Sequence, residues 1–506
     1  MQQPAVYPHP VDAVQLLETH ISWVLLTGDY AYKIKKPVNL GFLDFSTLAK
    51  RRYFCAEEIR LNSRLAAGLY LQVVRITGTV EKPEIDGAGP VLDYAVKMRQ
   101  FAQQDLLVQS LTDPPKAALY LDQLADLIAE FHNTIKVADG SMRFGSAQAV
   151  LEPVQENFRQ LREVTGNTYQ SELDALETWS LQEHQRCRAV FVQRKRDGFI
   201  RECHGDLHLG NIARYKDRVV PFDGIEFNPS LYWIDVISEL AFLVMDLQAK
   251  RQAGLSFRVL NAYLQCTGDY AGLQVLRYYL VYRALVRAKV AGIQLKQQAN
   301  AQACAEQQCS LDDYLHLATR YTRMAQPSLL LCHGLSAAGK STVSQHLLEQ
   351  LPGIRIRSDI ERKRLFADAA AIPVAKAQGL YSAPASEKTY QRLLQLATLI
   401  IDAGYTVIVD AAFLQYAQRR QFVRYARQQH VPFLIVHCQA RQETLCRRIV
   451  SRAEQVDNVS DADLVVLEQQ IKHQQTLSDQ ELAYCISIDT EAEIDLKPVL
   501  QRINPA

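Results

Sequence analysis

The stretch GLSAAGKST, at residues 334–342, decides the fold of the C-terminal part of this sequence. It fits the pattern G-x-x-x-x-G-K-[ST] at every fixed position, with the apolar run SLLLCHG (328–334) before it and the helical run STVSQHLLEQL (341–351) after it. Glycines let a backbone curl until several N–H groups converge on one point, and the dipole of the following helix favours negative charge there. The stretch therefore predicts a strand, a phosphate-binding loop and a helix in succession.

Further short apolar runs follow this loop and alternate with helical segments. The candidate strands lie at 328–334, 353–359, 406–412, 432–438 and 483–489. Strands separated by helices of ten or more residues pair in parallel. We therefore expect a domain boundary near residue 325 and, over residues 326–506, an α/β P-loop domain with a doubly wound parallel sheet.

The loop residues also suggest specific ligands. Lys340 is expected to reach the β- and γ-phosphates of ATP, and Ser341 is expected to hold Mg²⁺. The residues expected to bind the nucleotide are Gly334, Ser336, Ala337, Ala338, Gly339, Lys340, Ser341 and Thr342.

Charged side chains stand at the carboxyl ends of the next two strands, where ligands lie in such sheets. In IRSDIERKRLF (356–366), Asp359 can accept a proton from a hydroxyl that attacks the γ-phosphate, and Arg362 follows three residues later. Capping of the helix N-terminus is the alternative role of Asp359. Asp410, at the end of a third strand, is placed to support Mg²⁺ through water.

A predicted helix in ETLCRRIVSRAEQ (443–455) carries Arg447, Arg448 and Arg452, and the last two lie on one face at i, i+4. Arginines on a mobile lid neutralise the charge that develops on a transferring phosphoryl group. A solvated basic face is the alternative interpretation of this helix.

The loop, SD-x-x-R, VDA and the Arg-bearing helix together resemble the P-loop kinases that include the bacteriophage polynucleotide kinase and the zeta toxins. The resemblance covers roughly residues 327 to 506. It implies transfer of the γ-phosphate of ATP to a hydroxyl, with Asp359 as base, Arg362 at the acceptor or its phosphate, and Arg448 or Arg452 at the transition state. Acceptors in this group range from sugars to polynucleotides, so no acceptor is implied.

A second phosphate-handling pattern, HGDLHLGN, stands at residues 204–211. A kinase catalytic loop needs an Asp to orient and deprotonate the acceptor and an Asn five residues later for metal. Asp206 and Asn211 have this spacing. A second Asp for the nucleotide's Mg²⁺ is expected on a strand and turn, and Asp223 follows the apolar run RVVPF. A polar turn is the alternative.

The N-terminal segment supplies the remaining parts of such a site. Residues 20–38 predict two strands around a Thr-Gly-Asp turn, and 46–66 predict a helix that Ser46 could cap. Lys33 can reach the α- and β-phosphates, with Lys35 on the same strand face as its competitor. Glu57 or Glu58 can pair with the lysine.

This set resembles the aminoglycoside phosphotransferase family, whose loop reads H-G-D-x-H-x-x-N, over roughly residues 15 to 300. The resemblance implies an α+β, protein-kinase-like domain over residues 1–325, with His204 supporting the loop and His208 near the catalytic centre. A single Gly28 stands where a glycine-rich loop is usual in kinases. Helix residues expected near the acceptor pocket, with ordinary salt bridges as their alternative role, are Asp235, Arg283 and Arg287.

Length and composition set the limits for these expectations. A chain of 506 residues is too long for one hydrophobic core. A net charge of +1 gives no argument for a nucleic-acid or membrane partner. The ten cysteines include no C-x-x-C pair, which indicates a reducing cytoplasm. The N-terminus, MQQPAVYPHP, lacks the pattern of a signal peptide, and no run is long enough to span a membrane.

Two phosphoryl-transfer sites on one chain leave three classes of function open. We expect a bifunctional enzyme that uses ATP and Mg²⁺ to phosphorylate hydroxyl-bearing small molecules. A nucleic-acid or nucleotide end kinase is the second class, which the near-neutral charge disfavours. The third is a regulatory protein in which one ATP site gates the other, by autophosphorylation for example. Neither acceptor, nor the oligomeric state, is readable from the sequence.

Overall fold

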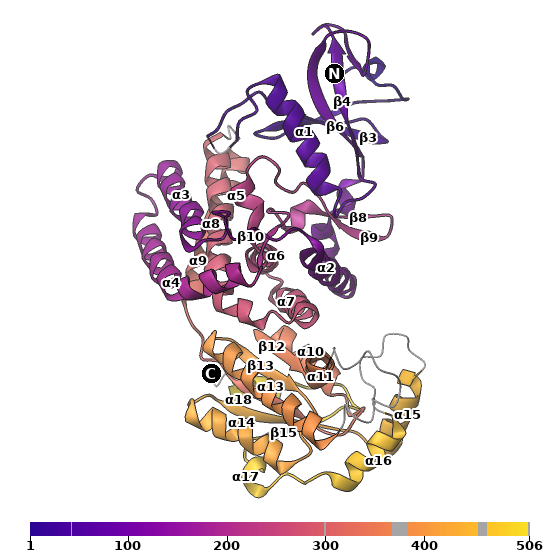
Figure 1. Cartoon of the computed structure of the whole chain (residues 1–506), viewed down its shortest axis with the longest axis vertical. Coiled ribbons are helices and arrows are strands. Elements are labelled where there is room, and N and C mark those ends of the chain that lie inside the picture. Colours follow the sequence, from indigo (N-terminus) through magenta and orange to yellow (C-terminus); the bar gives the residue numbers. More distant parts are fainter. Residues whose placement is uncertain (42, 298–299, 367–381, 454–462, 504–506) are drawn as a thin grey trace. The chain divides into compact units, whose positions relative to one another are not determined.

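The computed structural model describes residues 1–41, 43–297, 300–366, 382–453 and 463–503 (Figure 1). The chain forms two compact units: the first contains Met1–Lys250 and Val275–Arg320, and the second contains Arg251–Gln274 and Tyr321–Ala506. The sequence pointed to one division near residue 325. In the structure residues 251–274 belong to the second unit instead, because they pack on its sheet and helices.

The first unit begins with a six-stranded antiparallel sheet in the order β1-β2-β3-β6-β4-β5. The inner strand β3 is buried on both faces, at five consecutive residues from Ala31 to Lys35. Gly28 lies in the turn between the second and third strands with φ +94°, which only glycine adopts readily. The strands are β1 (Gln15–Glu18), β2 (Ser22–Leu26), β3 (Tyr30–Lys35), β4 (Tyr70–Gly78), β5 (Pro83–Ile85) and β6 (Val91–Arg99).

Helix α1 (Leu48–Asn62) packs on this sheet, against β4 and β6. Its N-cap is Thr47, whose side chain accepts a hydrogen bond from the amide of Lys50. Ser46, which the sequence offered as the cap, instead donates its hydroxyl to Asp44. Buried Cys55 and Glu58 mark the face of α1 that meets the sheet.

The rest of the first unit is mainly helical, with two short antiparallel pairs, β7 with β10 and β8 with β9. The Gln/Ala-rich stretch near residues 297–309 contains the first turns of α9 where it is described. The elements are α2 (Pro114–Thr134), α3 (Ala147–Thr165), α4 (Gln170–Arg196), β7 (Ile200–Glu202), β8 (Ile212–Tyr215), β9 (Arg218–Pro221), α5 (Pro229–Tyr232), β10 (Trp233–Asp235), α6 (Val236–Ala249), α8 (Leu273–Gln297, its first two residues counted with the second unit) and α9 (Ala301–Thr322, its last two residues likewise).

The second unit is built on a five-stranded sheet in the order β12-β13-β11-β14-β15, and all four strand pairs are parallel. All five strands were predicted. The order reverses at central β11, and ligands lie outside the carboxyl ends of strands at such a point. The strands are β11 (Leu329–His333), β12 (Gly353–Arg357), β13 (Thr406–Asp410), β14 (Phe433–Gln439) and β15 (Cys485–Asp489).

Helices connect these strands, as parallel pairing requires. They are α10 (Lys340–Gln350), α11 (Ser358–Leu365), α13 (Ala383–Asp402), α14 (Tyr416–Gln428), α15 (Gln442–Ala453), α16 (Leu464–His473) and α17 (Asp479–Leu482). Helix α18 (Lys497–Ile503) follows the last strand, and α7 (Ala253–Thr267) joins the unit from earlier in the chain. The two predicted fold classes, α+β followed by doubly wound α/β, are thus confirmed. Within the described ranges, no helix combines the length and apolar character needed to cross a bilayer.

Candidate functional sites

Strand β3 places Lys33 and Lys35, two residues apart, on one face of the N-terminal sheet. Nζ of Lys33 lies 2.9 Å from Oε1 of Glu58 and also pairs with Asp223. Nζ of Lys35 lies 2.7 Å from Oε2 of Glu58 and pairs with Glu226. Burial by itself raises the pKa of the Glu58 carboxyl, but the two ammonium groups outweigh burial and lower it. Both lysines therefore share one buried carboxylate.

The structure separates the two candidate glutamates of α1. Glu58 is fully buried in the lysine cluster. Glu57 instead pairs with Arg60, one turn along the helix, at 2.8 Å. Of the two lysines, Lys33 contacts Asp223, so it is the one that joins the expected metal-binding carboxylate.

Asp223 lies in a strained turn that three hydrogen bonds fix, two to side chains and one to a backbone carbonyl. Its φ is +60°, in the left-handed region that non-glycine residues rarely occupy. Its amide donates to the hydroxyl of Tyr70 at 2.9 Å, and the amide of Gly224 donates to Oδ1 of Asn62 at 2.7 Å. The amide of Phe222 donates to the carbonyl of Asn211 at 2.9 Å. These bonds fix the Asp223 carboxylate between Lys33 and the HGDLHLGN loop.

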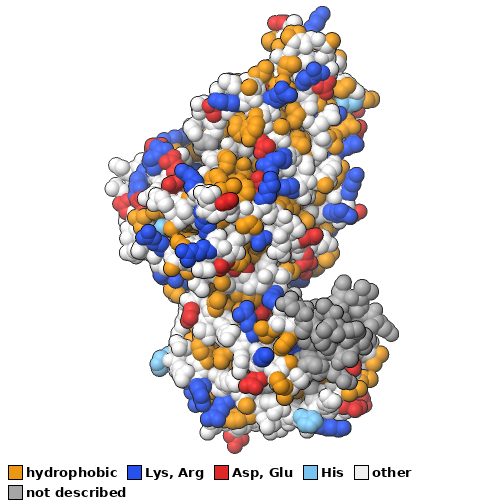
Figure 2. All heavy atoms as spheres, viewed as in Figure 1, with side chains coloured by type: hydrophobic (Ala, Val, Ile, Leu, Met, Phe, Trp, Pro, Cys, Tyr) orange, Lys and Arg blue, Asp and Glu red, His pale blue; other side chains and the backbone are white. Residues whose placement is uncertain are grey.

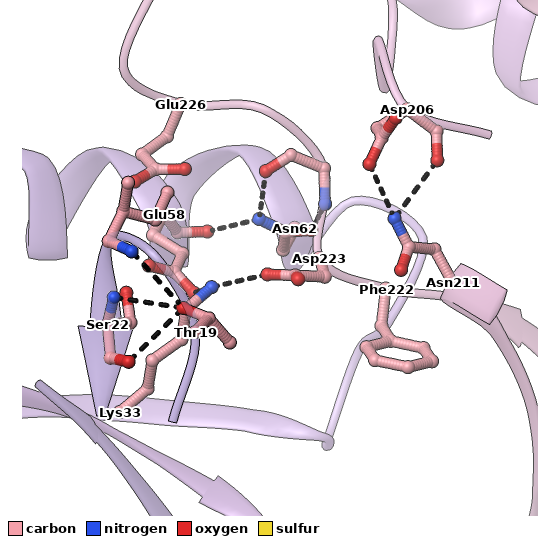
Figure 3. Close-up of polar contacts among 12 residues, drawn as sticks. Thr19, Ser22, Lys33, Glu58, Asn62, Asp206, Asn211, Phe222, Asp223 and Glu226 are labelled. Carbon is pink, nitrogen blue, oxygen red and sulfur yellow. Dashed lines mark hydrogen bonds and ion pairs between the residues drawn. The ribbon is translucent and has the colours of Figure 1, made fainter. Parts of the chain in front are cut away.

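In that loop, Nδ2 of Asn211 donates to the carbonyl of Asp206 at 3.1 Å and to its carboxylate Oδ2 at 2.9 Å (Figure 3). Nε2 of His208 lies 3.5 Å from the same Oδ2, and a third of the Asp206 side chain is exposed. Burial acts to raise the pKa of the Asp206 carboxyl, but His208 and other nearby positive charge lower it well below its usual range. Asp206 is therefore ionised at neutral pH, and part of its carboxylate is open to solvent.

Two acids of α6 hold the loop from behind, and sequence reasoning missed both. The carboxylate of Glu239, fully buried, accepts from the amides of His204 at 2.7 Å and Gly205 at 3.2 Å. Asp246 accepts from the amide of Leu209 at 2.9 Å. Burial opposes ionisation of Glu239, but hydrogen bonds and positive charge around it bring its pKa to about 2. Two acids seven residues apart in an otherwise apolar helix were the available signal.

The other named residues of the first unit act as supports. Nε2 of His204 lies 2.9 Å from the carbonyl of Phe222, which ties the loop to the end of β9. Nη1 of Arg283 donates to the carbonyl of Gly205 at 3.2 Å. Asp235 pairs with buried Arg194 at 2.7 Å and caps α6. Nε of Arg287 donates to the hydroxyl of Tyr314 at 3.3 Å.

In the second unit, the 334–342 loop curls as expected at the end of β11. Gly334 has φ +145°, and a Cβ there would lie 2.5 Å from the carbonyl oxygen of Cys438, so only glycine fits. Nζ of Lys340 reaches back to donate to the carbonyls of Gly334 at 3.0 Å and Leu335 at 2.7 Å. Gly339, at φ +82°, is the N-cap of α10.

The two residues expected to support Mg²⁺ lie side by side. Oγ of Ser341 donates to Oδ2 of Asp410 at 2.9 Å, and Oγ of Ser344 lies 3.3 Å from the same atom. Nε of Arg357 is 3.5 Å from it. Asp410 reaches this position because it pairs in register with Cys332 of β11, one residue before the strand's end. A hydroxyl and a carboxylate are the hard oxygen donors that Mg²⁺ prefers.

A cavity of about 330 Å³ opens at this edge of the sheet. Asp359 and Arg362 face it together with Lys340, and Nη1 of Arg362 lies 3.5 Å from Oδ1 of Asp359. Of the expected nucleotide-binding residues, those lining it are Ser336, Ala337, Gly339, Lys340 and Ser341. Another part of the wall, which sequence reasoning missed, comes from α16, whose Gln470 accepts from the amide of Ser336 at 2.8 Å. Thr342 is exposed on α10.

Of the arginines of α15, one contacts the phosphate-binding loop and another is exposed. Nη1 of Arg448 donates to the carbonyl of Ala337 in the loop at 3.2 Å, and Nη2 donates to the carbonyl of Thr490 at 2.7 Å. Arg447 is exposed. Arg452 lies in the last turn of α15, but its side chain falls outside the described part of the structure.

One family model and several solved structures match parts of this chain. Residues 329–477 match a family model described as an AAA domain, so the P-loop domain expected in the C-terminal part is confirmed. Among solved structures, a putative aminoglycoside phosphotransferase from Ralstonia eutropha JMP134 is 15% identical over 62% of this chain and 93% of that chain, with a TM-score of 0.41. The Mycobacterium tuberculosis APS kinase CysC is 20% identical over 35% of this chain and 98% of that chain, with a TM-score of 0.26. Likeness at these values assigns no activity.

Whole-chain relatives occur in mycobacteria. The uncharacterized proteins Rv2004c and MT2060 of Mycobacterium tuberculosis and Mb2027c of Mycobacterium bovis are each 30% identical to this chain over 452 residues. The match covers 88% of this chain and 88% of each relative, so it spans both units. The chain therefore belongs to the same two-unit family as these mycobacterial proteins.

Proposed function

We propose that the chain is an ATP-dependent phosphotransferase that moves the γ-phosphate of ATP to hydroxyl groups of small molecules at two separate sites. The observation that carries this proposal is the cavity of the second unit. Lys340 and Ser341 face it from the phosphate-binding loop, and Asp359 and Arg362 face it from α11. A phosphate-binding cation and a carboxylate able to accept a hydroxyl proton therefore share one space.

The first site supports the same chemistry with different parts. Lys33, held by Glu58, supplies positive charge for the phosphates of ATP. Asp206, held by Asn211, is ionised and open to solvent on one side. A low pKa makes Asp206 a weak base, so its main role is to orient the acceptor hydroxyl and receive the proton as the new bond forms.

At each site the acceptor oxygen forms a bond to the γ-phosphorus while the bond from that phosphorus to the bridging β-phosphate oxygen breaks. ADP leaves, and the hydroxyl proton passes to Asp206 or Asp359. When bound, Mg²⁺ would neutralise phosphate charge. Two oxygen-bearing sets would suit it: Ser341 with Asp410, and Asn211 with Asp223, whose turn is tied to Asn211 by the Phe222 amide. Arg362, and Arg448 or Arg452 from α15, would meet the negative charge of the acceptor side and of the transferring group.

A nucleic-acid end kinase is the weaker alternative. Tracking a phosphate backbone requires a continuous basic surface. On the faces of the two units in view in Figure 2, Lys and Arg side chains are interspersed with Asp and Glu. The net charge of +1 agrees with this mixed surface. We therefore propose small hydroxyl compounds as acceptors and a cytoplasmic setting, where ATP is available.

The test uses γ-labelled ATP and Mg²⁺, with and without a desalted small-molecule extract of cytosol. Wild type is compared with Asp206→Asn, Lys340→Ala and the double variant. We expect label on small molecules, with each single variant losing a different product. Label that stays on the protein would favour the regulatory alternative, and label released only as phosphate in all four proteins would contradict the proposal.

A further inference from the structure

Residues 251–274 belong to the second unit although the sequence places them between α6 and α8 of the first. They form α7 and the 3-10 turn η5 (Tyr270–Gly272). α7 lies against β12 and α10, as Figure 1 shows. The contacts of this segment show what it does for the second unit.

α7 covers the open edge of the parallel sheet. β12 is an edge strand, and an edge leaves backbone N–H and C=O groups unpaired. Nδ2 of Asn261 donates to the carbonyl of Gly353 at 2.9 Å, and its Oδ1 accepts from the amide of Arg355 at 2.6 Å. In a parallel ladder, one residue of the neighbouring strand makes this same pair of bonds to residues i and i+2. The buried Asn261 amide therefore takes the place of one residue of a sixth strand.

The N-terminal half of α7 is fixed to the helix of the phosphate-binding loop. Nη1 of Arg258 lies 2.7 Å from Oε1 of Glu349, near the end of α10. A Cβ on Gly254 would lie 2.8 Å from the carbonyl oxygen of Glu349, so the two backbones approach closely. Val259 and Leu264 are fully buried. The contact is thus packed as well as polar.

The C-terminal half of α7 holds both ends of α11. The side-chain oxygen of Gln265 lies 3.5 Å from Nη1 of Arg357, which is the N-cap of α11. Its backbone carbonyl accepts from Nη2 of Arg364, near the last turn of α11, at 2.6 Å. Arg364 also pairs with Glu361 on the same helix. One residue of α7 therefore contacts the beginning and the end of the helix that carries Asp359 and Arg362.

We infer that Asn261 and Gln265 are positioning residues of the second site. They hold β12 and α11 so that Asp359 and Arg362 face Lys340 across the cavity, an inference that rests on the proposed function of that site. Neither residue is among the described residues that line the cavity, so each acts through the element it holds. Displacement of a catalytic group by about 1 Å can cost about 100-fold in rate, which makes such support consequential.

Helix α7 also links the two units through the chain. The chain enters α7 directly from α6, and α6 carries the Glu239 and Asp246 that hold the loop of the first site. The second unit therefore takes an essential piece from within the sequence of the first. A fragment that begins at residue 326 would lack the cover of β12.

The test uses the full chain in an Asp206→Asn background, so that only second-site transfer is followed. Asn261→Leu and Gln265→Ala are compared with Gln265→Glu, which keeps an acceptor for Arg357, and with Ala253→Ser at the exposed start of α7. The assay is label transfer from γ-labelled ATP to extract compounds that depends on Lys340. We expect kcat to fall roughly 10- to 100-fold in the first two variants with KM for ATP unchanged, and near wild-type values in the other two.

Amide hydrogen exchange provides the second readout. Asn261→Leu should speed exchange in residues 353–365 and leave residues 334–342 as in the wild type. Unchanged exchange at 353–365, or wild-type kcat in both variants, would overturn the inference. Faster exchange throughout the second unit, with a raised KM for ATP, would also overturn it, because the segment would then be merely structural. A wild type that makes no Lys340-dependent product would refute the proposed function instead, and exchange alone would then decide the inference.

Discussion

In the first unit the ammonium group of Lys33 lies between two carboxylates, whereas in the second unit that of Lys340 lies against two neutral carbonyls of its own loop. One carboxylate comes from Glu58 of α1, and the other from Asp223, which lies 190 residues after Lys33 in the chain. The carbonyls belong to residues five and six positions before Lys340. The first site is therefore an assembly of distant charges, and the second is a local backbone structure that carries its lysine.

The buried groups next to the two loops also differ in charge. Behind the first loop, the buried carboxylate of Glu239 is ionised and accepts backbone N–H groups. Directly before the second loop stands His333, which is 6% exposed. Burial, followed by the charge of His437 and nearby basic groups, lowers the pKa of His333 to about 3, so the ring is neutral. A buried charged carboxylate therefore holds the first loop, whereas a buried neutral ring precedes the second.

The largest expected effect tests this contrast through stability. We expect Lys35→Met to lower the free energy of unfolding of the first unit by about 3–5 kcal/mol, because Glu226 and Glu58 lose a buried cationic partner. Lys340→Met should cost less than about 1 kcal/mol, since its described partners are neutral carbonyls. Urea unfolding followed by tryptophan fluorescence checks the first variant, because all three tryptophans, Trp23, Trp179 and Trp233, lie in the first unit. Circular dichroism follows the second. Equal losses would break the comparison.

Acid should distinguish the groups behind the loops. The folded pKa of His333 lies below its ordinary value of 6.5, so the unfolded chain binds more protons between about pH 6.5 and 3. Its contribution is complete above pH 6.5, and the second unit should lose about 3 kcal/mol by pH 4 from this group. The pKa of Glu239 is also lowered, from 4.5 to about 2, so its effect has the same sign, but its stabilisation is lost only as pH falls from 4.5 towards 2.

His333→Leu should therefore flatten the fall in stability of the second unit between pH 6.5 and 4, because a side chain that cannot take a proton replaces one that resists protonation. Amide exchange in residues 329–350, measured across this pH range and corrected for the intrinsic rate, reports the change. Residues 200–215 of the first unit provide the internal control. An unchanged slope in the variant would show that other groups dominate the acid response.

The same contrast explains how much of the molecule the sequence could predict. Lys340 and Ser341 stand in one contiguous pattern, and parallel register then brings Asp410 to the loop, so most of the second site was expected. The five strands followed from apolar runs of the right length. At the first site the HGDLHLGN loop was readable in the same way, but its partners outside the loop could be inferred only from the order of Lys33, Asp206 and Asp223. The choice of Glu58 over Glu57 depends on the rotation of α1 about its axis, which the sequence does not settle.

For other parts the sequence shows the residue or the helix but not what it contacts. Glu239 and Asp246 bind backbone amides, and any loop offers such amides, so no partner residue marks the contact. The helical pattern of α7 is local, but the unit it joins depends on one amide side chain meeting an edge strand. Asn261 would look the same in sequence if α7 packed on the first unit. The position of an element with few specific anchors is therefore harder to predict than its existence.

A smaller effect should follow from Arg448→Ala. The guanidinium bonds the carbonyl of Ala337 in the loop and both oxygens of Thr490. Its loss should weaken ATP binding about tenfold, equivalent to about 1.4 kcal/mol, because the loop is less fixed and one positive charge is removed. Titration with a fluorescent ATP analogue measures the change. The matched control is Arg447→Ala, an exposed neighbour, and equal weakening by both would indicate a general charge effect.

The smallest expected effect concerns the strained turn of the first site, where Tyr70→Phe removes a single oxygen. That hydroxyl accepts from the amide of Asp223, whose φ is +60°. Without it the amide is left unsatisfied in a part-buried position, so we expect a loss of about 1 kcal/mol in stability and a several-fold drop in first-site turnover. Urea unfolding detected by tryptophan fluorescence measures the stability, and Asp206-dependent label transfer measures the turnover. Tyr94→Phe, in which no described bond to this turn is lost, is the control. Tyr70 lies with Asp223 and Lys33 in the first site, and no described bond joins it to the loop that holds Lys340. A larger effect on second-site turnover than on first-site turnover would therefore contradict the separation of the two sites.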